Sequence, residues 1–395
     1  MSSSPLLRIL DAVRRAAPAV LAFLGIALVG AGLLILWGVY PVGARAGHPW
    51  PVEQVLRFTK SRSVSLHAGR VPDPRIPLTD PAALRRGGAH YDQVCAECHG
   101  APGRSREFFT REMLPRPPAL ATGEGIRDRT PKELHWVVDH GLKFTGMPGW
   151  PVPGRDDEIW AVVGFLEALP TLSPAEYRDM VRTPQTARNQ DAQAGSAEPS
   201  GLAREVVASC ARCHGDGQGD PSGAFPNLTL QDPEYLRLSL EAYAADRRHS
   251  AFMETQVEGL DPGTLDELAR FYGERSPVSP DREVSPGPLL ERGRKIAELE
   301  GIPDRGLSAC NSCHEAPQRS ELDADELPRY PHLAGQYAAY LTEQLVAWTD
   351  GSRGGNVQAD PEVEGSHQLT ADEIRAVAAW YSSRTPAPRG TSGPH

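Results

Sequence analysis

Apolar residues recur at helical spacing in two distant segments of this 395-residue chain. Side chains three and four positions apart share one face of an α-helix, so each stripe predicts an amphipathic helix. Thr370 and Glu373 stand where a capping box would start the second helix. We find no alternating pattern of strand length, and the sequence therefore predicts an all-α fold. The two stripes consist of Ile159, Val162, Val163 and Leu166 and of Ile374, Val377, Ala378 and Tyr381.

A long, almost uncharged run occupies residues 18–40. At about 1.5 Å per residue, a helix of this length reaches roughly 34 Å, which is enough to cross a bilayer. Basic residues before such a run and aromatic residues at its end orient a membrane helix with its N-terminus in the cytoplasm. The chain has both, with Arg8, Arg14 and Arg15 before the run and Trp37 and Tyr40 at its end.

We therefore expect residues 1–41 to form a cytoplasmic N-terminus and a retained transmembrane anchor. The alternative is a cleaved signal peptide, because Ala44-Arg45-Ala46 offers an A-x-A cleavage site. The apolar run is long for a signal peptide, which favours the anchor.

Four stretches rich in proline, serine or charge lack helical periodicity and predict connecting segments. They are 42–80, 183–200, 276–288 and 385–395. The first would be an irregular spacer that lifts the rest of the chain off the membrane, and the last a flexible tail. The sequence thus predicts three domains, at 81–182, 201–275 and 289–384.

Each predicted domain contains one C-x-x-C-H motif, and the three motifs use all six cysteines of the chain. Positions i, i+3 and i+4 of a helix share a face, so both thiols and the imidazole can point at one macrocycle. This motif is typical of covalent haem attachment, with the histidine as an iron ligand. The alternatives are a redox disulfide and a structural zinc site, but neither sequence context is present. The motif residues are Cys95, Cys98 and His99; Cys210, Cys213 and His214; and Cys310, Cys313 and His314.

The domains are internal repeats. Domains 1 and 3 align without a gap at an offset of 215, which carries His99 onto His314. Domains 2 and 3 align at an offset of 105, which carries Pro226-Asn-Leu228 onto Pro331-His-Leu333.

The order C-x-x-C-H, P-x-L, a loop methionine and a closing helix resembles the class I cytochrome c family. Domains 2 and 3 are similar to the tandem domains of bacterial dihaem cytochromes c. The resemblance implies three covalently attached haem c groups and places Pro118, Pro226 and Pro331 on the histidine side of each haem. In this family, the proline carbonyl orients the imidazole, and haem attachment takes place in the periplasm.

In this family the sixth iron ligand is usually methionine, whose thioether raises the reduction potential. The chain has five methionines. Met1 is the initiator, Met113 precedes its P-x-L segment, and Met180 follows a closing helix. We therefore expect Met147 and Met253 to bind iron, and the alternative for each is ordinary core packing.

The third domain contains no methionine. The offset of 215 carries Met147 onto Glu362, while His367 lies five residues further on. His332 lies inside the P-x-L segment and should be on the proximal side. His367, Glu362, water or an open site all remain alternatives for the sixth position, and His367 is as readily a solvated loop histidine.

The net charge of −10 argues against a nucleic-acid partner. We expect a single-pass protein of the bacterial inner membrane whose three haem domains lie in the periplasm. It would carry electrons from a respiratory donor to a terminal oxidase or reductase, and its partners would be redox proteins of the respiratory chain. The alternatives are a cytochrome subunit of a membrane-bound dehydrogenase and a haem enzyme or gas sensor with an open third haem.

Overall fold

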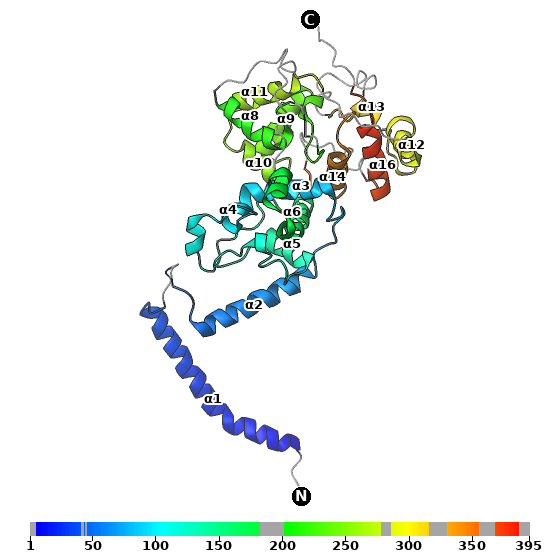
Figure 1. Ribbon diagram of the computed structural model, residues 1–395. Coiled ribbons are helices and arrows are strands. Elements are labelled where there is room, and N and C mark those ends of the chain that lie inside the picture. The colour runs from blue at the N-terminus through cyan, green and yellow to red at the C-terminus, as the bar shows by residue number, and fades with distance from the viewer. Residues whose placement is uncertain are drawn as a thin grey trace.

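The computed structural model describes residues 5–40, 43, 46–181, 201–217, 219–220, 222–277, 286–315, 330–354 and 368–386. These residues form helices, helical turns and loops, and their only β-type pairings are three isolated bridges (Figure 1). The all-α prediction is confirmed. The predicted linker at 183–200, most of the one at 276–288 and most of the tail lie outside the described residues, so the domain limits stay a prediction.

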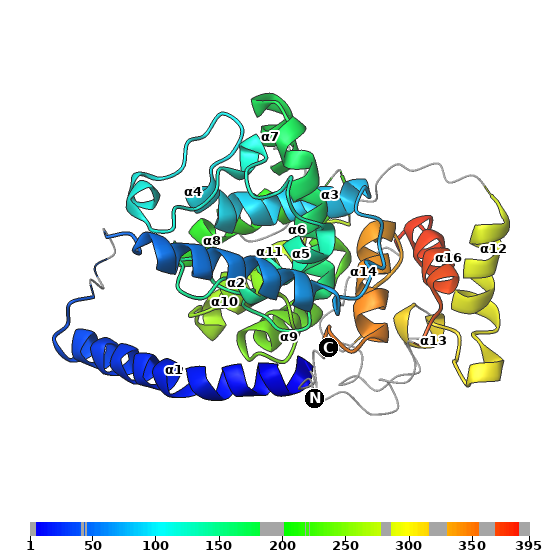
Figure 2. The ribbon, with the colours of Figure 1, turned by 90° about the horizontal axis from the view of Figure 1, so that it is seen from below.

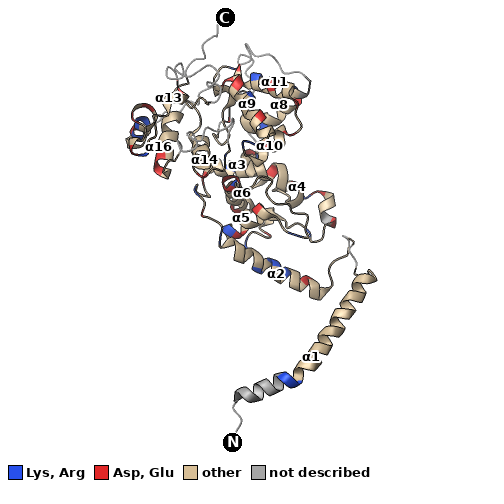
Figure 3. Ribbon diagram, turned by 180° about the vertical axis from the view of Figure 1, so that it is seen from behind, with Lys and Arg blue, Asp and Glu red and all other residues tan. Residues whose placement is uncertain are grey.

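The first helix, α1 (Pro5–Leu36), starts before the uncharged run and ends before its last residues. Its 23-residue part from Arg14 to Leu36 is long and apolar enough to cross a membrane, and none of that part is buried. Figure 3 shows a basic patch on α1, and between this patch, at Arg14 and Arg15, and the end of the helix at Leu36 no charged residue occurs. Helix α1 ends at Leu36, and Gly38 takes up a left-handed conformation two residues later. Trp37 and Tyr40 therefore lie just after the helix.

The expected irregular spacer is wrong for residues 50–68, which form the helix α2 (Trp50–Ala68). Pro51 stands in its first turn, where the missing N–H costs nothing. Val64 and Ala68 are buried, and the ring of His67 stacks on Trp136 of the helix α5 (Pro131–His140) at a centroid distance of 5.4 Å. The second half of α2 therefore packs on domain 1.

Each domain has a first helix that contacts its closing helix, and in domains 1 and 3 these two helices form the main packed pair. Domain 1 has α3 (Pro81–His90), the π-helical turn η1 (Tyr91–Cys95), α4 (Ala96–His99), η2 (Phe108–Glu112), η3 (Leu120–Thr122), α5 (Pro131–His140), α6 (Asp156–Ala168), η4 (Leu169–Thr171) and α7 (Pro174–Val181). Domain 2 has α8 (Gly201–His214), η6 (Leu228–Leu230), α9 (Pro233–Ala244), α10 (Ala251–Val257) and α11 (Pro262–Gly273). Domain 3 has α12 (Pro288–Arg294), the π-helical turn η7 (Lys295–Leu299), η8 (Pro303–Arg305), α13 (Asn311–His314), α14 (Ala338–Thr349) and α16 (Ala371–Ser382).

Glycines permit the closest of these helix crossings. A Cβ atom on Gly87 would lie 2.0 Å from the carbonyl oxygen of Ala161, and one on Gly293 would lie 2.1 Å from that of Ala376. The backbones of α3 and α6, and of α12 and α16, therefore touch. The predicted stripe residues Ile159, Val162 and Val163 are buried in the core that this contact creates in domain 1.

Domain 1 also packs against the other two domains (Figures 1 and 2). Arg86 of α3 forms an ion pair with Glu343 of α14, at 3.0 Å between Nε and Oε2. Glu158 of α6 accepts hydrogen bonds from the Ser250 hydroxyl and the Ala251 N–H, at 2.7 and 3.1 Å. In domain 1, α3 thus contacts domain 3 and α6 contacts domain 2.

Candidate metal centres

All three C-x-x-C-H motifs lie on helical turns, as their spacing predicts. The first spans η1 and α4, the second ends α8, and the third forms α13 together with the preceding Cys310. Gly100 and Gly215 follow the first two histidines with positive φ angles of 72° and 73°, which ends the helix immediately after the motif.

The six thiols are free and partly buried, so none of them forms a disulfide. Burial raises the pKa of Cys95 to about 12 and the pKa of Cys210 to about 11. A zinc site would need clustered thiolates. Among the described residues, the one group of three or more potential metal ligands contains no cysteine.

Each motif histidine is held by the carbonyl of its P-x-L proline. The distance from Nδ1 to the carbonyl oxygen is 3.0 Å for His99 and Pro118, 3.1 Å for His214 and Pro226, and 2.9 Å for His314 and Pro331. A carbonyl oxygen only accepts, so Nδ1 carries the proton and Nε2 keeps the lone pair that binds a metal. This contact was expected from the resemblance and is confirmed, while iron binding by the three histidines stays a prediction.

One continuous cavity of 780 Å³ joins the second and third motifs. It brings Cys210, Cys213, His214 and Met253 together, and it is also lined by Cys310, Cys313 and His314. Much of the remaining wall is apolar or aromatic, which suits a flat apolar macrocycle. It includes Leu228, Tyr235, Leu268 and Tyr272 in domain 2 and Leu333, Leu341, Val377 and Tyr381 in domain 3.

Two buried arginines of this cavity fit the carboxylates of a porphyrin. Arg248 and Arg353 are related by the offset of 105, and each guanidinium lies over an aromatic ring, at 4.8 Å from the centroid of Tyr243 and 4.7 Å from that of Trp348. Burial and the neighbouring Arg248 lower the pKa of Arg353. Two cations held side by side in a low dielectric favour an anionic group at the same place. The residues present therefore fit a haem in each half of the cavity.

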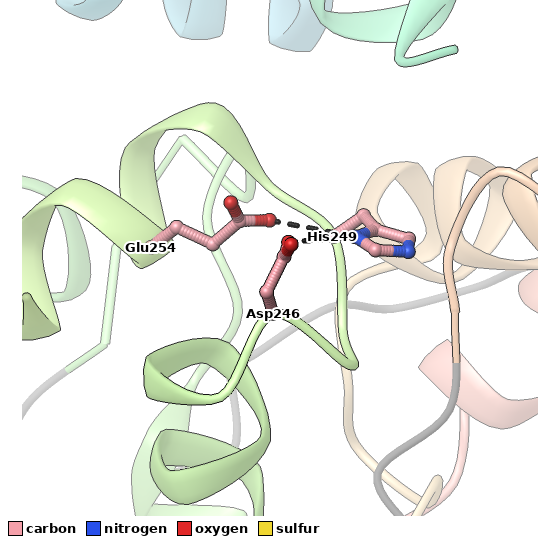
Figure 4. Close-up of side chains that lie close together, drawn as sticks. All are labelled: Asp246, His249 and Glu254. Carbon is pink, nitrogen blue, oxygen red and sulfur yellow. Dashed lines mark ion pairs between the residues drawn. The ribbon is translucent and has the colours of Figure 1, made fainter. Parts of the chain in front are cut away.

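Met253 lies in the first turn of α10, whose N-terminal cap is Ser250. Just before the cap, Nδ1 of His249 lies 3.6 Å from both Asp246 Oδ1 and Glu254 Oε1 (Figure 4). The Glu254 carboxylate also accepts from the Ser250 N–H at 2.9 Å. We interpret this partly exposed group as an ion-pair cluster that fixes the loop leading to Met253.

Met147 lies in the loop after α5 and does not line the cavity. The loop is a tight turn in which Met147 N–H donates to Thr145 Oγ1 at 3.1 Å and Leu142 N–H donates to the Met147 carbonyl at 3.2 Å. Met180 packs against the core of domain 1. Met147 as a ligand stays a prediction.

His367 and Glu362 both lie outside the described residues. His332, expected on the proximal side, has its Nε2 atom 3.0 Å from Asp232 Oδ2. The sixth ligand of the third domain therefore stays open.

The sequence interpretation missed that domain 1 closes part of the shared cavity. Arg86, His90, Gln93, Arg155 and Glu158 all line it. Gln93 Nε2 lies 3.7 Å from Cys213 Sγ, and the ring of His90 stacks on Phe252, next to Met253, at a centroid distance of 3.3 Å. The repeat alignment gave no signal for the contacts of Gln93 and His90, because each joins two different repeats.

Comparison with known proteins agrees with this geometry. Residues 82–166 match the family model described as cytochrome c oxidase, cbb3-type, subunit III. A thiosulfate dehydrogenase electron acceptor from Thiomonas intermedia is 30% identical over 183 residues, which cover 46% of this chain and 81% of that protein. Cytochrome c4 from Pseudomonas aeruginosa is 26% identical over 192 residues, covering 48% of this chain and 89% of the relative.

Among solved structures, the thiosulfate dehydrogenase TsdBA from Marichromatium purpuratum is 34% identical, with a TM-score of 0.37. The match covers 45% of this chain and 36% of that one.

The three helical motifs, each with its oriented histidine, define a c-type cytochrome. The chain belongs to the class I cytochrome c family, whose members are electron carriers with covalently bound haem c. Membership implies redox proteins as partners.

Proposed function

We propose that the chain is a membrane-anchored trihaem cytochrome c that carries electrons in the periplasm between a respiratory donor and a terminal oxidase or reductase. The observation that supports three haems is the repeated contact between a motif histidine and a proline carbonyl, at 3.0, 3.1 and 2.9 Å. His99, His214 and His314 are the proposed proximal ligands. Met147 and Met253 are the proposed sixth ligands of the first two irons.

The apolar segment Arg14–Leu36 supports the anchor, and we propose a single-pass location in the bacterial inner membrane. A helix near the N-terminus with this composition also suits a signal peptide. N-terminal sequencing of the mature protein separates the two, because a cleaved signal would leave a new N-terminus near Gly47.

A second candidate function is that of an electron acceptor dedicated to one dehydrogenase. The observation that favours it is the name of the relative from Thiomonas intermedia, a thiosulfate dehydrogenase electron acceptor. On this hypothesis, a purified thiosulfate dehydrogenase supplied with thiosulfate reduces the haems of this protein. A general carrier would be reduced equally well by unrelated periplasmic donors.

The mass of the mature protein tests the number of haems. We expect it to exceed the polypeptide mass by three porphyrins, and the haem colour should stay with the denatured chain on a gel. Two haems or fewer, in protein matured by a competent host, would overturn the trihaem proposal. In the protein with three haems, a potentiometric titration followed optically and by electron paramagnetic resonance would classify the axial ligands.

A further inference from the structure

Helix α2 has two apolar faces on opposite sides. At about 100° per residue, Val64 and Ala68 lie on one side, while Val55, Phe58 and Leu66 lie on the other. The first side is buried against domain 1. The second is solvent-exposed, with exposed fractions of 64% for Val55, 68% for Phe58 and 70% for Leu66. An amphipathic helix that only covered domain 1 would not need this second face.

The buried face holds α2 firmly on domain 1. His67 stacks on Trp136, and the Ser65 hydroxyl donates to Glu133 of α5 at 2.5 Å. The direction of the outer face is therefore set by the position of domain 1, and α2 is not a free linker.

The start of α2 is tied to the end of α1. The hydroxyl of Tyr40, four residues after α1, is hydrogen-bonded to Nδ1 of His48, two residues before α2, at 2.5 Å. The rings of Tyr40 and His48 are also stacked. The first turns of α2 thus begin close to the end of the apolar segment. In Figure 1, α2 lies between α1 and α5 and runs across the direction of α1.

We propose that the outer face of α2, formed by Val52, Val55, Phe58 and Leu66, lies on the periplasmic surface of the membrane. This inference rests on the proposed anchor. When α1 crosses the bilayer, the contact between Tyr40 and His48 brings the start of α2 to the interface, where an apolar helix face inserts among the lipid headgroups. Trp50, at the start of α2, is also exposed, with an exposed fraction of 72%, and indole rings are enriched at membrane interfaces.

One charged residue of α2 suits the same position. Arg62 is exposed and lies seven residues after Val55, on the outer side of the helix, while Arg57 is exposed on the other side and forms an ion pair with Glu53. Arginine and lysine side chains next to an interfacial apolar face reach the phosphates of anionic lipids. The result is a second attachment that fixes the orientation of domain 1 on the membrane.

Lipid photolabelling of the full-length haem protein tests the proposal. The protein is reconstituted in vesicles that contain phosphatidylglycerol and a phosphatidylcholine with a photoreactive acyl chain, and labelled peptides are mapped by mass spectrometry. We expect label on α1 and on the α2 peptide that contains Val55 and Phe58. The double variant Val55→Asp/Phe58→Asp should lose the α2 label and keep the α1 label.

The matched control is Leu289→Asp on α12, an exposed leucine far from α2 in sequence, which should leave both labels unchanged. Label on α1 without label on α2 in the wild type would overturn the proposal. Absence of label on α1 would instead contradict the proposed anchor. The unchanged haem spectrum of the double variant would show that it is folded.

Discussion

The closing helices of domains 1 and 3 start in opposite ways, although the offset of 215 superposes their sequences. In domain 3, Thr370 Oγ1 accepts from the Glu373 N–H at 3.4 Å, and Glu373 Oε2 accepts from the Thr370 N–H at 2.8 Å. In domain 1 the same two positions hold Arg155 and Glu158, which do not cap their own helix in this way. Helix α16 is therefore capped by its own residues, whereas the residues at the start of α6 make contacts with another domain.

The partners of Arg155 and Glu158 show what replaces the cap. Arg155 donates to the His249 carbonyl and, through a two-pronged contact of 2.8 and 2.7 Å, to Asp157. Glu158 accepts from Ser250 and Ala251 at the start of α10. The comparison teaches that the start of a closing helix can become an interdomain contact when its own capping residues are replaced. In domain 1 this contact supports α10, the helix that carries Met253.

The largest expected difference between the two domains is at the sixth iron ligand. Met147 of domain 1 corresponds to Glu362, and domain 3 has no methionine. We predict that Met147→Ala reduces the methionine-to-iron charge-transfer absorption by about half, because only Met147 and Met253 contribute to it. The third haem should titrate at the lowest potential. Met180→Ala, which affects only core packing, is the control.

Carbon monoxide binding sharpens this prediction. If His367 binds iron, all three reduced haems of the wild type are inert and His367→Ala opens one of them. If the third site is open, the wild type already binds carbon monoxide at one haem, and His367→Ala changes nothing. A charge-transfer band with the intensity of three haems would contradict both cases.

Local features of the fold could be predicted from sequence because their partners are near in the chain. The helical C-x-x-C-H turns, the capping box of Thr370 and Glu373, and the stripe of α6 all depend on residues within one or two turns. The contact between His99 and Pro118 could be predicted only from the family resemblance.

Features that depend on distant partners could not be predicted. The helix α2 lacks a single apolar stripe because its apolar residues lie on two opposite faces, so no clear helical pattern marked it. No local pattern marks Glu343, Arg86 and Arg155 as buried, and only domain packing shows that they are buried together. The one available signal was the replacement of a threonine cap by Arg155 at a repeat position.

Arg155→Met should separate domain 1 from the rest. The side chain is 3% exposed and compensates the charges of Asp157 and Glu158. Removing one partner of a buried ion pair leaves the other charge uncompensated, which destabilises by about 3–5 kcal/mol. We expect calorimetry to show the unfolding of domain 1 at a lower temperature, and solution scattering to show a larger radius. The exposed Arg178→Met is the control, and equal effects of both variants would contradict the interface.

The interdomain cluster should respond to pH. Burial raises the pKa of Glu343 to about 7, and this outweighs the attraction of Arg86 at 3.0 Å. A raised pKa means that the folded state holds the proton more tightly, so the stabilisation is complete below about pH 4.5 and is lost as the pH rises through 7. The free energy of unfolding should fall by on the order of 3 kcal/mol over this pH range. Asp157, Arg155 and Arg86 face this carboxyl. Burial also raises the pKa of the neighbouring Glu158, so this carboxyl contributes to the response with the same sign.

Domain 3 should show the opposite sign. Burial opposes ionisation of Glu373, but hydrogen bonds from Arg305 and from the Thr370 cap hold its pKa at about 2. Its stabilisation is present above about pH 4.5 and is lost as the pH falls through 2. Calorimetry between pH 4.5 and 8 should therefore show domain 1 detaching while domain 3 is unchanged. Glu343→Gln should flatten the first response, and Glu298→Gln, on the exposed side of η7, should not.

The smallest expected effect is that of Thr370→Ala. The exposed cap stabilises only α16, so its removal should destabilise domain 3 by about 1 kcal/mol and leave the docking of domain 1 unchanged. The Glu373 carboxylate keeps Arg305, which donates to it at 2.6 Å, and this limits the loss. Thr370→Ser should restore the stability because serine caps equally well. A loss as large as that of Arg155→Met would show that the start of α16 is also an interface, and the contrast between the two closing helices would fail.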